Sequence, residues 1–278
     1  MIQLHIEPGS YCNARCRFCV YRSTENLRRH KGRMDMALYH RLIDEAATIP
    51  EITEVAFSGL NEPLLDDRIF ERIGYAKAVR PGWIVEMFTN GVYLTPGTFD
   101  ILKRVKLDGL SISLNATTPE EHEEIMGLHG QFFSVCENID YAREHRGTMV
   151  IRVKAVYDGT RFNEKTAERF IQRWGHVGAR GDGQPVYEMN WAAQLDHTTI
   201  KGFDPNEGCA RALGQISVLW DGRVSLCCLD PFGHTVFGDL NAQSLRDIYN
   251  SEAYVRFREL HDQNRVNEHP TCRNCTRV

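Results

Sequence analysis

The first two-thirds of the chain alternates between short apolar runs rich in β-branched residues and longer amphipathic stretches. The apolar runs predict six strands, at residues 2–8, 54–59, 84–91, 109–116, 149–159 and 185–192. The stretches between them repeat apolar residues at helical spacing, as Leu38, Leu42 and Ala46 do after the N-cap candidate Asp35. Repeated alternation of strand and helix is typical of a parallel α/β sheet, which is a barrel or a doubly wound sheet.

The pattern changes near residue 195. The segment 195–209 is rich in turn-forming residues and is predicted as a linker. After Cys209, the run 216–228 carries Asp221 and Gly222 at its centre, which predicts a β-hairpin. A helix near 244–260 and a cysteine-bearing tail follow. We therefore expect an α/β domain at residues 1–195 and a smaller domain at residues 196–278.

Composition narrows the class of protein. Of the 278 residues, 42% are apolar and 25% are charged, which is ordinary for a globular protein. The net charge of −4 argues against electrostatic capture of nucleic acid or of an anionic membrane. The sequence shows no apolar run of membrane-spanning length and no secretory signal pattern at residues 1–10. We expect a cytoplasmic protein, whose nine cysteines are metal ligands or core residues rather than disulfides.

Three of these cysteines lie together just after the first predicted strand. Cys12, Cys16 and Cys19 form a C-x3-C-x2-C loop, and ligands of parallel α/β folds gather at the carboxyl ends of the strands. Thiolate sulfur suits iron–sulfur clusters, which four cysteines normally hold. Three cysteines leave one iron for a ligand from outside the protein. The alternatives are a set of surface thiols or an incomplete zinc site.

The loop resembles the cysteine motif of the radical S-adenosylmethionine (SAM) enzymes, including an aromatic residue, Phe18, before the third cysteine. The resemblance implies a partial (β/α)6 TIM-like barrel and a 4Fe–4S cluster on the three cysteines. It also implies that the amino and carboxylate groups of SAM chelate the open iron. Reductive cleavage of SAM then yields a 5′-deoxyadenosyl radical that abstracts hydrogen from a substrate.

Further stretches match parts of this family that contact SAM. The turn "SGLNEPLL" (58–65) stands where relatives have a glycine-rich turn ending in Glu, and Asn61 replaces the usual second glycine. The resemblance implies cofactor-binding roles for Phe18, Ser58, Gly59, Asn61, Glu62, Asn90, Ser113 and Asn115. The arginine that many relatives place beyond the fourth strand is missing from this sequence. His129, or Arg152 and Lys154, are its candidate substitutes.

A second cysteine set lies in the last third of the chain. It consists of Cys209, Cys227, Cys272 and Cys275, the last two within "CRNC". On spacing alone, four thiolates suit zinc or an iron–sulfur cluster equally well. The order of these cysteines resembles the SPASM/twitch extension of radical SAM enzymes. The shortened twitch form, a β-hairpin plus helix with one auxiliary 4Fe–4S cluster, is the better match. Cys228 is expected to point away from the cluster, because adjacent strand residues face opposite ways. Cys136 is predicted to be a core thiol.

A cluster closed by four cysteines suggests an electron acceptor. The resemblance therefore implies an oxidoreductase that dehydrogenates a small polar substrate, with flavodoxin or ferredoxin as electron donor. A peptide-modifying enzyme is less expected, because the chain begins at the first strand without a peptide-recognition domain before it. An epimerase is a third possibility, with Cys228 returning hydrogen to the substrate. A non-catalytic zinc-binding interaction protein is the alternative from another class.

Two groups of residues are candidates to face the substrate. The segment 21–33 is basic, and Arg28, Arg29, Lys31 or Arg33 would meet an anionic substrate. The alternative for this segment is a solvated loop. The end of the sixth predicted strand would present Glu188, Asn190 and Trp191 to the cavity. The sequence identifies neither the substrate nor a general base.

Overall fold

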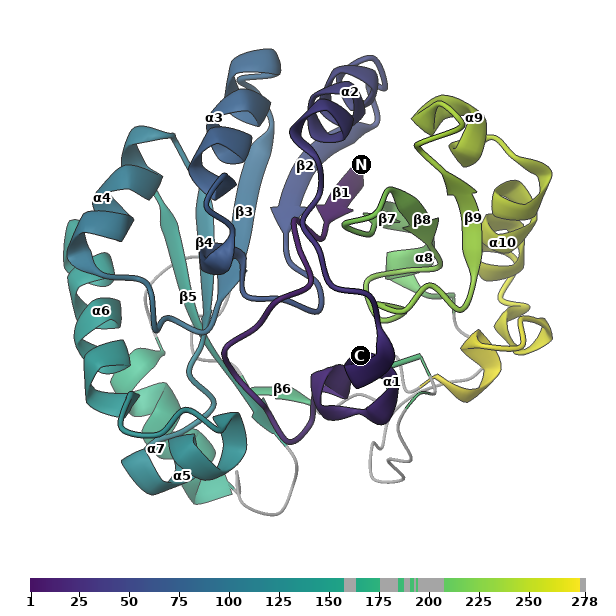
Figure 1. Cartoon of the computed structure of the whole chain (residues 1–278). Helices are drawn as coiled ribbons and strands as arrows, with labels where there is room; N and C mark the ends of the chain where they lie inside the picture. Colours follow the sequence, from purple (N-terminus) through teal and green to yellow (C-terminus); the bar gives the residue numbers. More distant parts are fainter. Residues whose placement is uncertain (158–163, 176–184, 188–190, 193, 195–207, 276–278) are drawn as a thin grey trace.

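The computed structural model describes residues 1–278 apart from 158–163, 176–184, 188–190, 193, 195–207 and 276–278, which Figure 1 draws as a grey trace. The described strands form one sheet in the order β6-β5-β4-β3-β2-β1-β7-β8-β9. Neighbouring strands from β6 to β1 are all parallel. These six strands correspond to the predicted ones and are β1 (Ile2–Ile6), β2 (Ile52–Phe57), β3 (Ile84–Thr89), β4 (Gly109–Ser113), β5 (Val150–Tyr157) and β6 (Pro185–Tyr187).

Helices follow the strands and cover the outer side of the curved sheet (Figure 1). The N-cap prediction is confirmed, because the Asp35 side chain accepts hydrogen bonds from the backbone at the start of α2. Thr95 and Thr118 cap the starts of α4 and α5 in the same way. The helices are α2 (Met36–Ala47), α3 (Ile69–Val79), α4 (Pro96–Arg104), α5 (Pro119–Met126), α6 (Phe132–His145) and α7 (Glu164–Trp174), with the short α1 (Thr24–Arg28) after the cysteine loop.

The two faces of the parallel sheet differ in character. Every second strand residue, such as Leu4, Val55 and Met87, is buried in the main apolar core. The alternate residues face the opposite, concave side and include polar side chains such as His5 and Ser111. The apolar pattern therefore anchors each strand to the helices and leaves the concave side for polar groups. This arrangement is the partial α/β barrel that the family resemblance implied, a choice that the apolar pattern alone left open.

The last third of the chain extends the same sheet. Strand β7 (Gln215–Val218) pairs parallel with β1, and β8 (Arg223–Ser225) and β9 (Val236–Asp239) continue antiparallel. The predicted hairpin around Gly222 is confirmed. The single helix predicted near 244–260 is instead two helices, because Ser251 caps a new one. The helices are α8 (Ala210–Gly214), α9 (Leu245–Tyr249) and α10 (Glu252–Asp262), followed by the 3-10 turns η3 (Val266–Glu268) and η4 (Cys272–Asn274). The predicted domain boundary at 195/196 lies outside the described residues.

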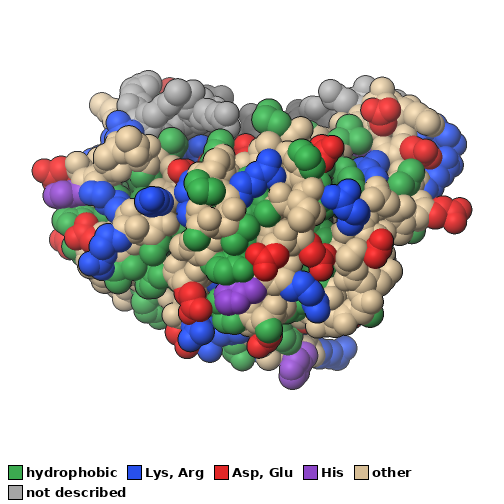
Figure 2. All heavy atoms as spheres, turned by 90° about the horizontal axis from the view of Figure 1, so that it is seen from above, with side chains coloured by type: hydrophobic (Ala, Val, Ile, Leu, Met, Phe, Trp, Pro, Cys, Tyr) green, Lys and Arg blue, Asp and Glu red, His purple; other side chains and the backbone are tan. Residues whose placement is uncertain are grey.

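Charges of both signs are mixed on the face seen in Figure 2. Lysine and arginine side chains lie between aspartate, glutamate and apolar side chains, so neither sign of charge gathers into a patch among the residues described there. Among the described helices, none combines the length and the apolar character needed to cross a membrane.

Candidate active site

A cavity of about 200 Å³ opens at the carboxyl ends of the parallel strands. The structure brings together around it all the residues that the sequence predicted for this edge of the sheet. They are Cys12, Cys16, Phe18, Cys19, Ser58, Gly59, Asn61, Glu62, Asn90, Ser113 and Asn115. Four segments that are far apart in the sequence therefore meet at one cavity, which is the position expected for a ligand in a parallel α/β fold.

The cysteine loop is held in place by backbone hydrogen bonds to the end of α5. The backbone N–H groups of Arg15 and Arg17 donate to the carbonyls of Met126 and Ile125, both at 2.9 Å. The Cys12 N–H donates to the Tyr21 hydroxyl oxygen at 2.9 Å. These contacts fix the loop against the barrel through its backbone. The thiols themselves make long contacts within the described residues, Cys16 with the Met126 sulfur and Cys19 with the Tyr21 N–H, both at 3.4 Å.

The three thiols of this loop lie in an environment that disfavours thiolates in the absence of a cation. Burial raises the pKa of the Cys12 thiol to about 12 and that of Cys19 to about 11. Burial, and then its neighbours Cys19 and Cys12, raise the pKa of Cys16 well above its ordinary value. A bound metal centre reverses this preference, because a coordinating thiol is deprotonated by the metal charge.

Glu62 is a buried carboxylate at the edge of the cavity. Its oxygens accept hydrogen bonds from the Thr89 hydroxyl at 2.7 Å and from the backbone N–H groups of Asn90 at 2.7 Å and Leu64 at 3.1 Å. Burial raises the pKa of Glu62 to about 7, against the opposing effect of these hydrogen bonds. A carboxylate has about four acceptor positions. Three are filled from the protein, and the fourth is available to a cationic donor in the cavity.

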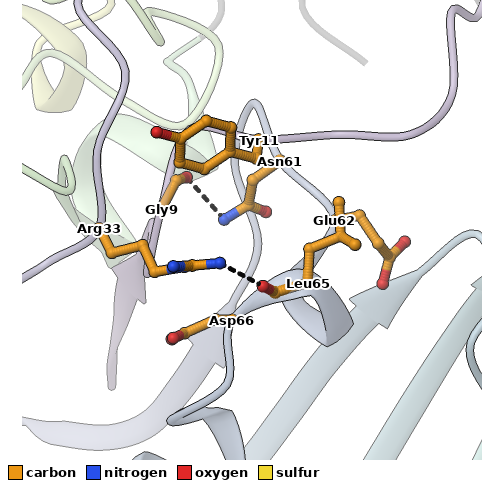
Figure 3. Close-up of a pocket in the computed structure, with 7 residues that line it drawn as sticks. All are labelled: Gly9, Tyr11, Arg33, Asn61, Glu62, Leu65 and Asp66. Carbon is orange, nitrogen blue, oxygen red and sulfur yellow. Dashed lines mark hydrogen bonds between the residues drawn. The ribbon is translucent and has the colours of Figure 1, made fainter.

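Asn61 and Glu62 differ in the direction of their side chains (Figure 3). The Asn61 amide nitrogen donates to the Gly9 carbonyl at 2.9 Å and ties the turn to the end of the first strand segment. The Glu62 side chain runs away from Tyr11 and Arg33. Asn61 therefore supports the turn through Gly9, although it also lines the cavity.

Asn90 and Asn115 also make contacts within the protein. The Asn90 side-chain nitrogen donates to the Asn13 side-chain oxygen at 2.7 Å, which links β3 to the cysteine loop. Asn115 has a φ of 56°, a conformation that asparagine tolerates better than most residues. Its side-chain oxygen accepts a hydrogen bond from the backbone N–H of Val156 at 2.9 Å. Both side chains shape the cavity wall, whichever ligand they contact.

A buried ion pair behind the cavity was not predicted from the sequence. The Arg29 guanidinium donates to both oxygens of Glu7, at 3.0 and 2.6 Å, and both side chains are less than a tenth exposed. Glu7 also accepts from the backbone N–H groups of Leu60 at 3.2 Å and Trp220 at 3.3 Å. It therefore joins four parts of the chain: β1, the segment after the cysteines, the turn before Glu62 and the β7–β8 turn. A Cβ on Gly59 would lie 2.9 Å from the Glu7 side chain, so this turn requires glycine.

Other residues of the cavity wall were also missed in the sequence. Phe88 and Val156 lie on the concave side of their strands. Each is two residues from another residue expected on that side, Asn90 and Lys154, and residues two apart in a strand share a face. Trp191 lines the cavity as expected, and its indole nitrogen donates to the Phe18 carbonyl at 2.8 Å. Its predicted companions Glu188 and Asn190 lie outside the described residues.

The basic segment after the cysteines is largely engaged with the protein itself. The Lys31 ammonium donates to the Asn26 side-chain oxygen at 2.6 Å, and the Arg33 guanidinium donates to the Leu65 carbonyl at 3.0 Å. Arg29 pairs with Glu7, whereas Arg28 is exposed. Of the candidate substitutes for the missing arginine, His129 is 81% exposed and contacts Glu123 at 3.3 Å. This contact agrees with the simpler interpretation of His129 as a residue at a helix end.

The second cysteine set gathers between α8, the end of β8 and η4. Cys209 is the N-cap residue of α8, and its N–H donates to His261 Nδ1 at 3.2 Å. Burial raises the pKa of the Cys227 thiol well above its ordinary value, and its neighbours Cys228, Cys275 and Cys272 raise it further. All nine cysteines of the chain are free thiols. Cys136, predicted as a core thiol, is half-buried and packs against the main core.

Cys228 was expected to point away from Cys227 because adjacent strand residues face opposite ways, but the two cysteines do not lie in a strand. Strand β8 ends at Ser225, so the alternation of strand side chains does not extend to residues 227 and 228. Both thiols pack beside the buried Leu229 and Cys275. The Cys228 pKa is raised by burial and lowered by Arg211. Cys228 is therefore a fifth thiol in the same cluster of side chains.

The cysteine sets differ from a site for a single ion. Among the described residues, no three His, Cys, Asp or Glu side chains converge closely enough to hold one metal ion. A four-iron cluster binds each cysteine through a different iron, so its ligands surround it instead of converging on one point. The thiols of the first set line a cavity, which suits the larger group.

Comparison with known proteins places this site in context. The chain is 23% identical to the tungsten-containing aldehyde ferredoxin oxidoreductase cofactor-modifying protein of Pyrococcus furiosus, over 99% of this chain and 87% of that protein. It is 22% identical to the S-adenosyl-L-methionine-dependent 2-deoxy-scyllo-inosamine dehydrogenase of Niallia circulans, over 99% of this chain and 92% of that protein. Among solved structures, BtrN in complex with AdoMet and 2-DOIA has a TM-score of 0.69 and 19% identity, covering 100% of this chain and 94% of that one.

The family profiles cover both cysteine sets. The profile of the radical SAM superfamily matches residues 6–172, which include the cysteine loop, the Glu62 turn and the strands that form the cavity. The SPASM profile, described as an iron–sulfur cluster-binding domain, matches residues 209–276 and includes the second cysteine set. The chain therefore belongs to the radical SAM superfamily and carries a SPASM-type iron–sulfur cluster-binding domain in its last third.

Proposed function

We propose that this radical SAM enzyme dehydrogenates a carbon–hydrogen centre of a small polar substrate. In this proposal Cys12, Cys16 and Cys19 hold the SAM-binding 4Fe–4S cluster. The second set holds an auxiliary 4Fe–4S cluster through Cys209, Cys227, Cys272 and Cys275. When bound, these groups supply one-electron chemistry: SAM is cleaved reductively, a 5′-deoxyadenosyl radical removes a hydrogen atom from the substrate, and the auxiliary cluster accepts an electron.

The residues around the cavity fit the SAM-binding group. Three thiols on one loop suit a cluster that keeps one iron for SAM. Glu62 has a free acceptor position at the cavity edge, and we assign it to the ammonium of SAM. We assign the remaining predicted residues to the walls that orient the rest of SAM: Phe18, Ser58, Gly59, Asn61, Asn90, Ser113 and Asn115.

The observation that supports the dehydrogenase proposal is a second group of cysteines joined to the same sheet, to which we assign a complete ligand set. The Gln215 side chain accepts from the backbone N–H of Cys228 at 3.2 Å and donates to the Gln3 side chain of β1 at 3.1 Å. A cluster with four cysteine ligands has no iron left to bind substrate, which suits electron transfer. Oxidation of an alcohol to a carbonyl removes a hydrogen atom, a proton and an electron, so it needs an electron acceptor of this kind. The similarity to the Niallia dehydrogenase along nearly the whole chain supports the same reaction class.

The proteins similar to this chain include proteins that bind or act on peptides as well as an enzyme that acts on a small molecule. The similar proteins include a PqqA peptide cyclase and SuiB bound to its precursor peptide SuiA, as well as the small-molecule dehydrogenase. We favour a small molecule because the dehydrogenase match spans 99% of this chain, whereas the peptide cyclase match spans 41%. A flavodoxin or ferredoxin is proposed as the electron donor.

Anaerobic reconstitution with iron and sulfide tests the proposal. We expect about eight irons per chain, as two 4Fe–4S clusters require, and dithionite-dependent release of 5′-deoxyadenosine from SAM. The variant Cys12→Ser should release no 5′-deoxyadenosine, while its auxiliary cluster remains. Cys136→Ser is the matched control, because this half-buried thiol belongs to neither set, and it should keep both properties.

Two other results would change the assignment. Colourless protein with tightly bound zinc would contradict the enzyme and favour a zinc-binding interaction protein. Product at the oxidation level of the substrate, carrying deuterium from solvent, would contradict dehydrogenation and favour epimerisation. In that case Cys228→Ser should abolish the uptake of deuterium.

A further inference from the structure

The concave face beside the cavity carries Lys154, a candidate substitute for the missing arginine that does not itself line the cavity. Along β5, Ile151, Val153 and Ala155 are buried in the core against the helices. The alternate residues Lys154 and Val156 therefore face the concave side. Val156 lines the cavity, so Lys154 lies one step deeper on the same face of the strand.

Two contacts place the Lys154 side chain just behind the cavity wall. Its ammonium nitrogen is 4.8 Å from the centroid of the Phe88 ring, and its backbone register partner on β4 is Ser113. Phe88 and Ser113 both line the cavity. The ring supports the ammonium without neutralising its charge, because a cation–π contact is a weak electrostatic interaction.

Three carboxylates in this part of the molecule are already engaged with other groups. Glu86 accepts from the Arg152 guanidinium at 2.9 Å, and this pair is largely buried. Glu62 accepts from Thr89 and two backbone groups, and Glu7 pairs with Arg29. Within the described part of the chain, the half-buried Lys154 forms no ion pair. Burial and then the neighbouring Arg152 lower the pKa of Lys154, and the opposing effect of Glu86 does not offset them.

Arg211, two residues after Cys209 in α8, lowers the pKa of both Lys154 and Cys228 by its charge. The curvature of the sheet brings β5 and this part of the chain to face the same interior (Figure 1). A substrate that loses a hydrogen atom in the cavity and an electron to the auxiliary cluster would bind beside this lysine.

We propose that Lys154 is a specificity residue that binds an anionic group of the substrate, either a carboxylate or a phosphate. The compact ammonium binds either anion as a point charge. Its position suits an anion held between the cavity and the auxiliary cysteines. That the anion belongs to the substrate of this enzyme rests on the proposed function. The same charge would also suit the carboxylate of SAM, so the experiment measures the two ligands separately.

The test uses reconstituted enzyme, with inorganic phosphate as the probe for the substrate anion. The dissociation constant for phosphate is measured with SAM present, from the shift of the thermal unfolding midpoint at constant ionic strength. The SAM dissociation constant is measured by equilibrium dialysis. We expect Lys154→Met to weaken phosphate binding roughly tenfold or more, the effect of losing one charged contact, and to leave SAM affinity unchanged. Lys154→Arg should keep phosphate binding, and Lys103→Met, at an exposed lysine, is the matched control.

Two outcomes would overturn the inference. Unchanged phosphate binding in Lys154→Met would show that the lysine binds no such anion. A loss of SAM affinity in Lys154→Met would assign the lysine to the SAM carboxylate instead. Failure of the proposed function is a separate result, because it appears as missing iron or missing SAM cleavage in the wild-type enzyme, whereas the comparison of variants reports on Lys154 alone.

Discussion

The ion pair between Glu7 and Arg29 gives the sharpest prediction for stability. Replacing Glu7 by Gln keeps the size of the side chain but removes its charge, leaving the Arg29 guanidinium buried without a counter-ion. The amide retains an oxygen that can accept from Leu60 or Trp220, whose N–H groups the carboxylate now binds at 3.2 and 3.3 Å. Of the two bonds to Arg29 at 3.0 and 2.6 Å, one is lost because the amide nitrogen cannot accept, and the other is no longer ionic.

The expected loss follows from the burial of this pair. Glu7 and Arg29 side chains are 1% and 7% exposed, and removing one partner of a buried pair costs about 3–5 kcal/mol. Total unfolding free energies of proteins are about 5–15 kcal/mol, so the variant should lose a large share of its stability. The variant Glu268→Gln, which breaks the exposed pair with Arg265, should lose less than about 1 kcal/mol of unfolding free energy.

Urea unfolding of the apoprotein under reducing conditions, followed by circular dichroism, measures these differences. The midpoint for Glu7→Gln should fall by about 1 M or more, since slopes in urea are about 1–3 kcal/mol per molar. The double variant Glu7→Gln/Arg29→Met should lose less than the sum of the two single variants, because it leaves no charge alone. Equal losses for Glu7→Gln and Glu268→Gln would refute the reasoning.

Three further predictions concern titration and cluster content. Burial raises the Glu62 pKa from 4.5 to about 7, so the free energy of unfolding of the apoprotein should fall by up to about 3 kcal/mol as pH rises across that range. The urea midpoint of Glu62→Gln should not show this fall with pH. The same fall in the variant would contradict the prediction. Because burial lowers the His5 pKa from 6.5 to about 4, stability should fall as pH drops across that range, and His5→Gln should remove this loss in the same assay. Cys227→Ser should hold about four irons per chain and Cys228→Ser about eight; the reverse result would make Cys228 the ligand.

The parts of the fold that follow from local pattern are predictable from the sequence. The six parallel strands and their helices follow the alternation of apolar residues, because each strand buries one face against helices. The residues around the cavity come together because each lies on or just beyond a strand end, as Glu62 and Asn90 do. Strand ends of a parallel sheet share one edge, so their order along the chain is enough to predict the gathering.

Other features depend on contacts that local pattern does not contain. Glu7 has partners at positions 29, 60 and 220, and no spacing in the sequence connects them. The end of β8 is set by the fully buried Asp230, whose side chain accepts from the backbone N–H groups of His234 and Thr235 and closes a turn after Cys227. For this reason, the expectation that Cys227 and Cys228 alternate along a strand was wrong.

The pairing of β1 with β7 has a consequence for the order in which the protein is made. Gln3 and Gln215 are register partners although they lie 212 positions apart. At about 5–20 residues per second, the ribosome needs roughly 10–40 s to add the residues between them. Until then the backbone groups on one side of β1 have no strand to pair with, and such an open strand can recruit other chains. The cysteine loop follows β1 directly, so the nascent chain is exposed to mispairing at the same end where its first cluster must be assembled.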